Sequence, residues 1–534
     1  MTYSYRKYIA EDKKVVNAET INTYAATNCD RLTGDVKGMV IEFPDVDNNS
    51  RALAEETAAG FADLGIAYAR VSTAPWDWGS AGVVRTADLI VDAIREKYAL
   101  TDSAPVVAYG KGMGATSALL YTVGSRHTVS ACAAEFPVTD TTASLFAGAD
   151  KLPRTIIRSI YSYDMPLKEG LKEISPIEKV GAMPDIPYYI VGGSGDEFVG
   201  TEALLKFVNE LGKVSKSVTF NMIDGADHGE ISPYESAKSE DFLKTWASTA
   251  VSVAEKNEPS GCSPVTAFVG NGVSAGKAYE KYASEDAEIF SFENLRYFTR
   301  NNLNYIKGEI KGIVMEFPGL GGSSCLGGLV NMGEYKTEFA LSCAEQGILV
   351  MYMYCGPWSW GNKGVVRIAD LVIDALIKHY GLPADIPVVS TGGSMGGLGT
   401  FMFTEGSRHN VVGCMAACPC YDIIGKYTSY SSNPNFPRTF ISAIYNYDMS
   451  LEDGLKAITP CEHIDTMPKV PYYIVCNVED ECFDDEGMQV FADDMRAIGH
   501  DVTIKVLPNT KHGEFTDEER VSYRSFILDC ILKK

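Results

Sequence analysis

The sequence predicts an α/β protein built from two similar domains, each a mostly parallel sheet flanked by helices. A repeat that covers nearly the whole chain predicts the two domains, because each half has the length of one α/β domain. Short apolar segments that alternate with helical patterns predict the parallel sheets. The candidate functional residues follow the ends of these apolar segments, which is where α/β sheets place their sites.

The two halves of the chain share several segments in the same order. The segment G-V-V-R-T-A-D-L-I-V-D-A-I begins at Gly82 and recurs as G-V-V-R-I-A-D-L-V-I-D-A-L from Gly364. Other matched pairs are Phe43 with Phe317, Trp76 with Trp358, Tyr188 with Tyr472 and His228 with His512. The polar stretch 256–264 is the expected linker, so the predicted domains are 1–258 and 259–534.

The second half shows the alternation of strand and helix most clearly. Strands are expected at 312–317, 348–354, 387–391, 411–417, 471–475 and 502–507. Helical patterns lie between them, for example at 365–379 and 489–498. Strands that are apolar throughout are typical of a parallel sheet that is covered on both faces.

The composition argues against several functional classes. The chain of 534 residues has 70 acidic and 47 basic side chains and a net charge of −23, which disfavours nucleic acid and anionic membranes as partners. It contains neither an N-terminal signal pattern nor an apolar run long enough to span a membrane. These features predict a cytoplasmic protein that binds neither nucleic acid nor membrane, and they are compatible with a homo-oligomer.

The 13 cysteines form no C-x-x-C pair. Cys414, Cys418 and Cys420 make the tightest group, in an apolar segment and just after it. A zinc site and buried, reduced thiols are the alternatives for this group, and the apolar surroundings favour the thiols. We therefore expect no metal and no organic cofactor.

One motif of the second half suggests a nucleophile. The sequence V-V-S-T-G-G-S-M-G-G-L-G, from Val388 to Gly399, contains G-x-S-x-G directly after an expected strand and at the start of a helix. Gly392 and Gly396 allow a sharp strand-to-helix turn that exposes the hydroxyl of Ser394. A glycine-rich turn with a capping serine is the alternative, and the strand-then-helix context favours the nucleophile.

A nucleophilic serine needs a base, and the base needs an acid that orients it. His512 lies on the loop after the last expected strand. Asp480 lies beyond the strand 471–475, where the repeat matches it with Asp196, and Asp484 and Asp485 are nearby competitors. The other histidines of this half are expected to be solvated helix ends (His379, His500), a structural anchor (His409) or a residue with no histidine counterpart in the first half (His463).

In this order, Ser394, Asp480 and His512 resemble the catalytic residues of the α/β-hydrolase superfamily. The G-G-S-M-G-G turn, the acidic loop and the K-H-G-E loop are most similar to the dienelactone-hydrolase, acetyl-esterase and prolyl-oligopeptidase-like branches. The resemblance covers each half almost from end to end. It implies that Ser394 attacks a carbonyl, that His512 acts as general base and then acid, and that Asp480 orients the imidazole.

The resemblance also implies two backbone donors for an oxyanion. One is the N–H of Met395, which follows the nucleophile. The other is the N–H of Leu320, in the glycine-rich loop 319–328 after Phe317 and Pro318. The superfamily more often has His-Gly at this point, and a glycine-rich surface loop is the alternative.

The first half lacks the nucleophile, because Gly112 takes the place of Ser394. The offset between the halves grows from 274 at Phe43 to 282 at Trp76, so the segment that should supply an oxyanion donor is eight residues shorter. It carries Asp45 and Asp47, which would bring negative charge. We therefore predict a degenerate hydrolase domain. It retains Asp196 and His228, for which a structural role is favoured and ligand binding is the alternative.

Aromatic residues near the expected site are candidates for substrate binding. Trp358, Tyr427 and Tyr430 would line a pocket for an aromatic acyl group or a sugar. A purely structural role is the alternative for Trp358, because Trp76 is present in the half without a nucleophile.

Together these features favour a serine hydrolase that cleaves a carboxylic ester of a small molecule, with one active site in the second half. A serine peptidase of the prolyl-oligopeptidase-like kind is the first alternative, and the lack of a propeller repeat and of an acidic pair for a substrate amine disfavours it. A non-catalytic binding or scaffold protein is the second alternative. The complete Ser–Asp–His order argues against it.

Overall fold

A computed structural model of the chain describes residues 3–46, 52–72, 74–147, 152–250, 274–320, 333–429 and 436–533. The chain divides into two compact units. Unit 1 comprises Met1–Asp164, Lys168–Ala267 and Ile444–Glu452, and unit 2 comprises Met165–Leu167, Phe268–Ala443 and Asp453–Lys534. The predicted domain boundary at 258/259 lies outside the described residues. Each unit also includes a short segment from the other half of the chain, Ile444–Glu452 in unit 1 and Met165–Leu167 in unit 2. These two exchanged segments were not expected from the sequence.

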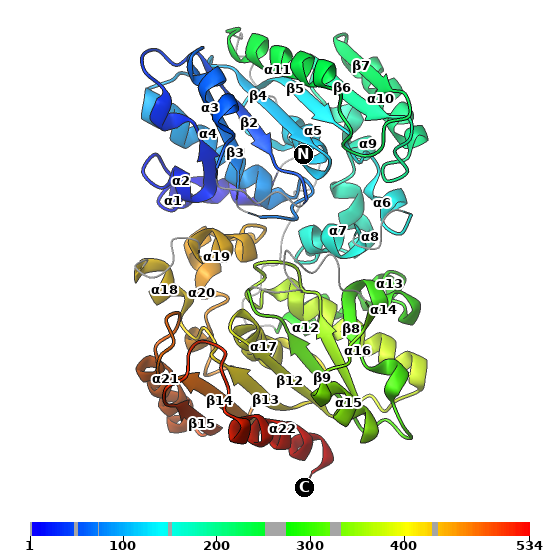
Figure 1. Cartoon of the computed structure of the whole chain (residues 1–534), viewed down its shortest axis with the longest axis vertical. Helices are drawn as coiled ribbons and strands as arrows, with labels where there is room; N and C mark the ends of the chain where they lie inside the picture. The colour runs from blue at the N-terminus through cyan, green and yellow to red at the C-terminus, as the bar shows by residue number, and fades with distance from the viewer. Residues whose placement is uncertain are drawn as a thin grey trace. The chain divides into compact units, whose positions relative to one another are not determined.

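The described part of unit 1 contains a seven-stranded sheet with the order β1-β3-β2-β4-β5-β6-β7. Only the edge pair β1 and β3 is antiparallel among these strands. Helices lie on both faces of the sheet (Figure 1). The strands are β1 (Ala25–Thr27), β2 (Gly38–Phe43), β3 (Ile66–Val71), β4 (Val106–Lys111), β5 (Val129–Glu135), β6 (Tyr188–Gly193) and β7 (Val218–Ile223).

The helices of the first half range from single turns to five turns. The longest is α4 (Ala81–Tyr98), which the repeated G-V-V-R segment forms. The others are α1 (Ile9–Asp12), α2 (Ile21–Tyr24), α3 (Glu55–Ala62), α5 (Met113–Gly124), α6 (Thr141–Ser144), α7 (Leu152–Ile160), α8 (Leu167–Glu173), α9 (Pro176–Lys179), α10 (Thr201–Val214) and α11 (Pro233–Ala247).

The described part of unit 2 contains an eight-stranded sheet with the order β10-β8-β11-β9-β12-β13-β14-β15. Here β8 is antiparallel to β11, and the central strands are parallel. Strand β10 lies in the stretch where the second half of the sequence is longer than the first. The strands are β8 (Thr299–Asn301), β9 (Gly312–Phe317), β10 (Gly333–Glu334), β11 (Ile348–Met353), β12 (Val388–Gly393), β13 (Val411–Ala417), β14 (Pro471–Asn477) and β15 (Asp501–Leu507).

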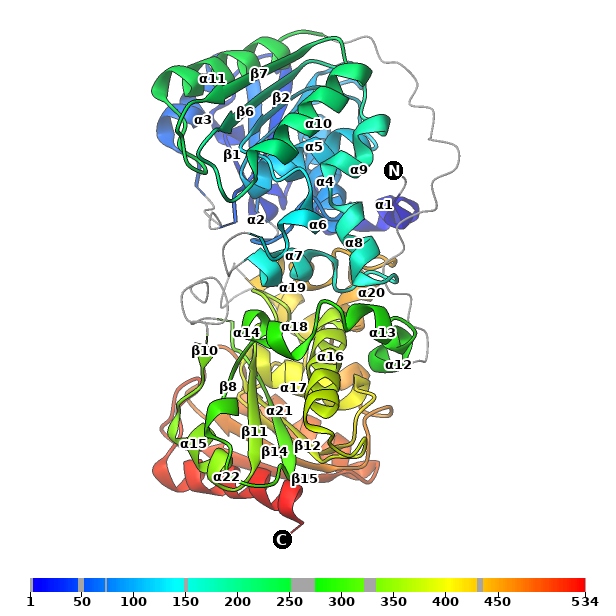
Figure 2. The same cartoon turned by 90° about the vertical axis from the view of Figure 1, so that its right-hand side faces the viewer.

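Helices cover both faces of this second sheet as well (Figure 2). They are α12 (Ala275–Glu280), α13 (Ala283–Asp286), α14 (Leu295–Phe298), α15 (Glu338–Glu345), α16 (Lys363–Tyr380), α17 (Met395–Gly406), α18 (Ile423–Ser429), α19 (Phe436–Ile444), α20 (Leu451–Lys456), α21 (Asp485–Ala497) and α22 (Asp517–Leu532). No helix in the described part of the chain combines the length and the hydropathy needed to cross a bilayer.

Alternate residues of each central strand enter opposite cores of unit 2. Met415 and Tyr473 face one core, which α15 and α22 complete through Phe339 and Ile531. Their neighbours Cys414 and Tyr472 face the other core, with α17 and α21. Because both faces are buried, the central strands are mostly apolar on both faces, and this is why the sequence shows continuous apolar segments rather than alternation.

These observations confirm the predicted fold class of two mostly parallel sheets flanked by helices. The expected strands 312–317 and 411–417 coincide with β9 and β13, and the other expected strands differ from the observed ones by one or two residues at their ends. The edge strands β8 and β10 are too short to leave a pattern in the sequence.

The repeated G-V-V-R segment places a fully buried arginine in unit 1. The Arg85 guanidinium donates to both carboxylate oxygens of Asp12, with Nε–Oδ2 and Nη2–Oδ1 distances of 2.7 and 2.8 Å. It also donates to the carbonyl oxygens of Tyr447 (3.0 Å) and Met449 (2.7 Å), in the segment Ile444–Glu452 of the same unit. One side chain thus holds three separate stretches of unit 1 together.

The repeat builds the same arrangement in unit 2. Arg367 donates from Nε and Nη2 to Oδ2 of Asp286, at 2.9 and 2.6 Å, and from Nη2 to the carbonyl oxygen of Met165 at 2.7 Å. Asp286 in turn accepts from the backbone N–H of Leu167 (2.8 Å). The side chains of Arg367 and Asp286 are both 1% exposed. Because water cannot solvate either charge, each is stabilised by its partner.

We predict that Arg85→Met destabilises unit 1 by about 3–5 kcal/mol, because it leaves the Asp12 carboxylate buried without its partner. Chemical unfolding of the variant and the wild type measures the difference. The double variant Asp12→Leu, Arg85→Met is expected to recover part of the loss, since it removes both charges. A cost below about 1 kcal/mol for the single variant would contradict this account.

A second buried carboxyl of unit 1 makes stability depend on pH. Asp77 is completely buried, and its Oδ1 accepts from the hydroxyl of Ser117 (2.8 Å). Burial raises the pKa of Asp77 from its ordinary value of 3.8 to about 7, against the smaller lowering effects of hydrogen bonds and of Arg158. The folded chain therefore binds this proton more tightly than the unfolded chain does.

Because the folded-state pKa is raised, the contribution of Asp77 to the free energy of unfolding should fall as pH rises from about 4 to about 7, and should then level off. Asp77→Asn removes this contribution. We expect the stability difference between Asp77→Asn and wild type to shift in favour of the variant by up to roughly 4 kcal/mol between pH 4 and pH 8. Urea unfolding of both proteins at these pH values tests this, and a difference that does not change with pH would refute it.

Candidate active site

Ser394 occupies a sharp turn between β12 and α17. Its φ and ψ angles are 59° and −123°, a region that side chains other than glycine rarely adopt. The turn is held by a hydrogen bond from the Ser394 N–H to the carbonyl oxygen of Ala417 at the end of β13 (2.8 Å). The neighbouring strand therefore maintains the strained backbone at Ser394. The chain turns sharply at this residue, between the end of β12 and the start of α17.

The glycines of the motif are required by close packing of the backbone. A Cβ atom at Gly392 would lie 2.7 Å from the carbonyl oxygen of Phe317 at the end of β9. A Cβ at Gly396 would meet the same carbonyl group and would lie 2.8 Å from the carbonyl oxygen of Pro318. Glycine at these two positions lets the first turn of α17 approach the end of β9, so the nucleophile candidate and the loop after β9 lie close together.

His512 and Asp480 form a hydrogen-bonded pair at the ends of β15 and β14. The distance from Nδ1 of His512 to Oδ2 of Asp480 is 2.7 Å. The Asp480 side chain is 2% exposed and the His512 side chain is 27% exposed. The other carboxylate oxygen, Oδ1, accepts from the backbone N–H groups of Cys482 (2.7 Å) and Phe483 (3.0 Å). The carboxylate is fixed by its own loop, and it leaves Nε2 of His512 available as a base.

The two loops are braced against each other. The amide of Asn477 donates to the hydroxyl of Thr510 (2.6 Å) and to the carbonyl oxygen of Glu514 (2.8 Å). The Glu514 carboxylate accepts from the backbone N–H of Lys511 (2.8 Å). These bonds fix the loop that carries His512, so the imidazole does not depend on Asp480 alone for its position.

The competing acids and histidines have other partners. Asp484 caps α21 by accepting from the N–H of Gly487 (2.9 Å) and pairs with Lys426, and Asp485 accepts from Gln489. His500 was expected to be a solvated helix end, which is wrong: it is 5% exposed, and its Nε2 lies 3.0 Å from the carbonyl oxygen of Ile464. His500 follows the turn after α21, and this turn brings its ring against the backbone at Ile464. Of the other histidines, His409 is hydrogen-bonded to the Asp370 carbonyl oxygen and His463 to the Glu405 carboxylate. The His379 ring stacks on Phe292.

Of the two residues expected to supply the oxyanion donors, one lies next to the serine itself and the other next to a residue that adjoins the serine. Met395 is the first residue of α17, directly after Ser394. Leu320 follows Gly319, and a Cβ atom at Gly319 would lie 3.7 Å from the Cβ atom of Ser394. The loop that carries Leu320 therefore passes beside the nucleophile candidate, and its continuation from 321 to 332 is outside the described residues.

The expected substrate-binding residues have different environments. Trp358 is 5% exposed, at a positive φ of 56°, and the Arg438 guanidinium lies 4.8 Å from its ring centre. Tyr427 is partly exposed on α18, and Tyr430 is outside the described residues. The burial of Trp358 agrees with the structural alternative more than with an open pocket wall.

Cys418 is a neighbour of the site that sequence reasoning did not find. It follows β13 directly, with a positive φ of 44°, and its sulfur accepts from the backbone N–H of Gly513 (3.3 Å). Potential metal-ligand atoms of Cys418, Asp480 and His512 lie within 4.8 Å of one another. This donor set suits zinc, but Asp480 and His512 already bond to each other, and burial raises the pKa of the Cys418 thiol to about 12. Its place directly after an apolar strand was the only signal in the sequence.

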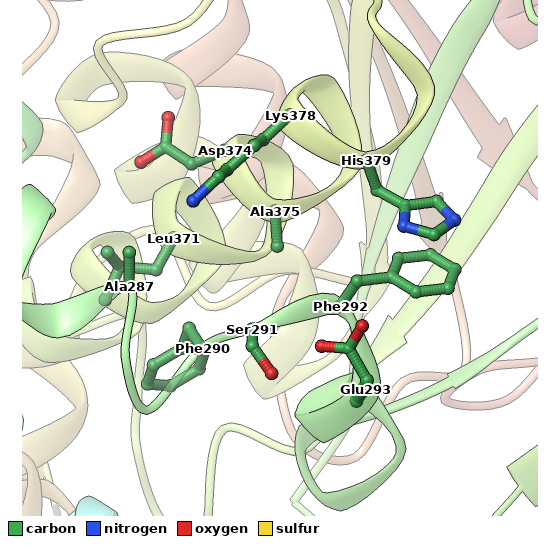
Figure 3. Close-up of a pocket in the computed structure, with 10 residues that line it drawn as sticks. All are labelled: Ala287, Phe290, Ser291, Phe292, Glu293, Leu371, Asp374, Ala375, Lys378 and His379. Atoms are coloured by element: carbon green, nitrogen blue, oxygen red, sulfur yellow. The ribbon is translucent and has the colours of Figure 1, made fainter.

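The cavity of about 450 Å³ in unit 2 lies elsewhere, between α16 and the segment that leads into α14. Figure 3 shows the His379 ring lying flat against the ring of Phe292 at one end of it. None of the expected site residues lines this cavity. Its lining comprises Ala287, Phe290, Ser291, Phe292, Glu293, Leu371, Asp374, Ala375, Lys378 and His379.

No model of a protein family matches the chain. A comparison with curated proteins gives no match either. Solved structures that match part of the chain include a puromycin-hydrolysing peptidase of Mycobacterium tuberculosis (15% identity, 42% of this chain and 35% of that chain, TM-score 0.35) and an acylaminoacyl peptidase of Pyrococcus horikoshii (14%, 42% and 37%, TM-score 0.34). Esterase B of Lactobacillus rhamnosis matches with 12% identity, 43% and 78% coverage and a TM-score of 0.32. The chain spans just over a third of the length of the two peptidases.

Proposed function

We propose that this chain is a serine hydrolase that cleaves a carboxylic ester through a covalent acyl-enzyme, with its active site in unit 2. The observation that carries the proposal is a serine at a strained strand-to-helix turn on the sheet edge that also holds a braced His512–Asp480 pair. The N–H of Ser394 bonds to Ala417, and the next residue, Cys418, accepts from the residue after His512. Short links therefore connect the turn to the histidine loop.

In the proposed reaction the hydroxyl oxygen of Ser394 attacks the ester carbonyl carbon, and its proton passes to Nε2 of His512. Asp480 stabilises the imidazolium that forms. The carbonyl oxygen becomes an oxyanion that accepts hydrogen bonds from the N–H groups of Leu320 and Met395, at the positive end of α17. The alcohol leaves with the proton from His512, and water then releases the acyl group by the same steps.

The proposed substrate is a small-molecule ester, with an aromatic acyl group or a glycan as the larger part. In this proposal Tyr427, Tyr430 and Trp358 contribute to binding this part of the substrate. A cytoplasmic location also belongs to this proposal, and the free thiols of the described cysteines support it.

We expect a fluorophosphonate probe to label Ser394 and no other serine. Ser394→Ala should abolish both labelling and ester turnover while the fold is retained, since alanine is no larger than serine at this turn. Peptide mapping locates the label, and a panel of chromogenic acyl esters and aminoacyl amides measures turnover. Hydrolysis by Ser394→Ala at the wild-type rate would overturn the mechanism, and preferential turnover of the amides would replace the esterase by a peptidase.

Asp480→Asn should lower kcat by about 10³–10⁴-fold, because the amide no longer stabilises the imidazolium. His512→Ala should be at least as severe, and neither change should add to the effect of Ser394→Ala, because the three residues act as one unit. The matched controls are Asp196→Asn and His228→Ala, which alter the equivalent pair of unit 1 (2.8 Å). Equal losses from the unit 1 and unit 2 variants would contradict a single active site in unit 2.

A further inference from the structure

The equivalent site of unit 1 contains an anion that the chain itself supplies. The carboxylate oxygen Oδ1 of Asp45 accepts from two backbone N–H groups, those of Val46 (2.7 Å) and Met113 (3.1 Å). Met113 is the first residue of α5, a helix of 12 residues, so the carboxylate also lies at the positive end of the helix dipole. The other acid of this loop, Asp47, lies outside the described residues.

These two donors are the counterparts of the proposed oxyanion donors of unit 2. The repeat aligns Phe43-Pro44-Asp45-Val46 with Phe317-Pro318-Gly319-Leu320, and it aligns Met113 with Met395. The turns have nearly the same backbone angles, with φ and ψ of 52° and −120° at Gly112 and of 59° and −123° at Ser394. In unit 1 the two N–H groups converge on a single oxygen, which is the geometry that an oxyanion hole needs.

The acid–base pair of unit 1 also keeps the geometry of a working site. Nδ1 of His228 lies 2.8 Å from Oδ2 of Asp196. Oδ1 of Asp196 accepts from the backbone N–H groups of Phe198 and Val199, both at 3.0 Å. This repeats the arrangement around Asp480, and His228 is 24% exposed, close to the exposure of His512.

Asp45 and a side chain at position 112 exclude each other. An ideal Cβ atom at Gly112 would meet the Asp45 carboxylate, 2.7 Å from its Cγ atom and 2.8 Å from Oδ2. At the same position in unit 2, Gly319 leaves this space open, because a Cβ there would be 3.4 Å from its nearest neighbour, the carbonyl oxygen of Gly393. The two sites thus differ at two positions: Asp45 stands in place of Gly319, and Gly112 stands in place of Ser394.

We propose that unit 1 retains the framework of a second acyl-transfer site, which lacks a nucleophile and whose oxyanion hole is occupied by the carboxylate of Asp45. The proposal rests on the function proposed for unit 2 and concerns the same class of ester substrate. A substrate oxyanion would have to displace a carboxylate that makes two charge-assisted hydrogen bonds at a helix N-terminus. Restoring the serine alone is therefore not sufficient, whereas removing Asp45 as well opens the site.

The first test uses three variants in the Ser394→Ala background, so that any labelled serine belongs to unit 1. Gly112→Ser alone should not react with a fluorophosphonate. Asp45→Gly with Gly112→Ser should react at least tenfold faster at position 112. In this step the introduced serine oxygen bonds to phosphorus, fluoride leaves, and the proton passes to His228. Adding His228→Ala should abolish the reaction, and peptide mapping by mass spectrometry identifies the labelled position.

Equal labelling of the first two variants would overturn the proposal, because Asp45 would then not close the site. Absence of labelling in both would also overturn it, provided that circular dichroism and thermal unfolding show both to be folded. If the variants do not fold, the second test decides. Absence of label on wild-type Ser394 is a different result, since it refutes the function proposed for unit 2.

The second test transfers the closing side chain to unit 2. Gly319→Asp should place a carboxylate against the N–H groups of Leu320 and Met395 and should slow labelling of Ser394 by at least ~10²-fold, the scale of losing an oxyanion donor. Gly319→Ala adds the same Cβ atom without the charge and should retain at least tenfold more reactivity than Gly319→Asp. Equal reactivity of the two variants would show that a carboxylate at this position does not block the hole.

Discussion

The strand-to-helix turn after the central strand is the constraint on which the rest of each site depends. It forces residue 394 into a positive φ, and it brings the first turn of α17 against the backbone at the end of β9. Glycine at 392 and 396 is the only solution that leaves room for this approach. Once the approach is made, the start of α17, the backbone after β9 and the serine lie close together, which is the arrangement that the proposed reaction requires of its oxyanion donors.

The acid and the histidine depend on the same sheet in a less direct way. They lie on loops after β14 and β15, and neighbouring parallel strands end at the same edge as the turn. Loops alone would leave them mobile. The bonds from Asn477 to the histidine loop, and from two backbone N–H groups to one oxygen of the acid, remove this freedom, and the pair at 2.7 Å is the result.

Comparison of the two units distinguishes the features that belong to the shared fold from the nucleophile that only unit 2 contains. Unit 1 keeps the turn, the converging N–H groups and the Asp–His pair, although it has no nucleophile. The N–H groups of Val46 and Met113 do not remain without an acceptor, because buried N–H groups at a helix start need a hydrogen-bond partner. Asp45 provides it. The repeated arginines, Arg85 and Arg367, are scaffold in the same sense, because each donates to a buried carboxylate and to a backbone carbonyl group of its own unit.

The sequence by itself determined the fold class, the order of the central strands along the chain and the set of site candidates. Apolar segments mark strands buried on both faces, and the repeat allows each candidate to be checked against its counterpart. Only the tertiary structure decided which acid pairs with His512, that His500 is buried, that Cys418 adjoins the histidine loop and that Asp45 accepts from the N–H groups of Val46 and Met113. These facts depend on distances between loops that are far apart in the chain. A pattern along one strand or helix records which face is buried, and it contains no information on which loop ends meet at the edge of the sheet.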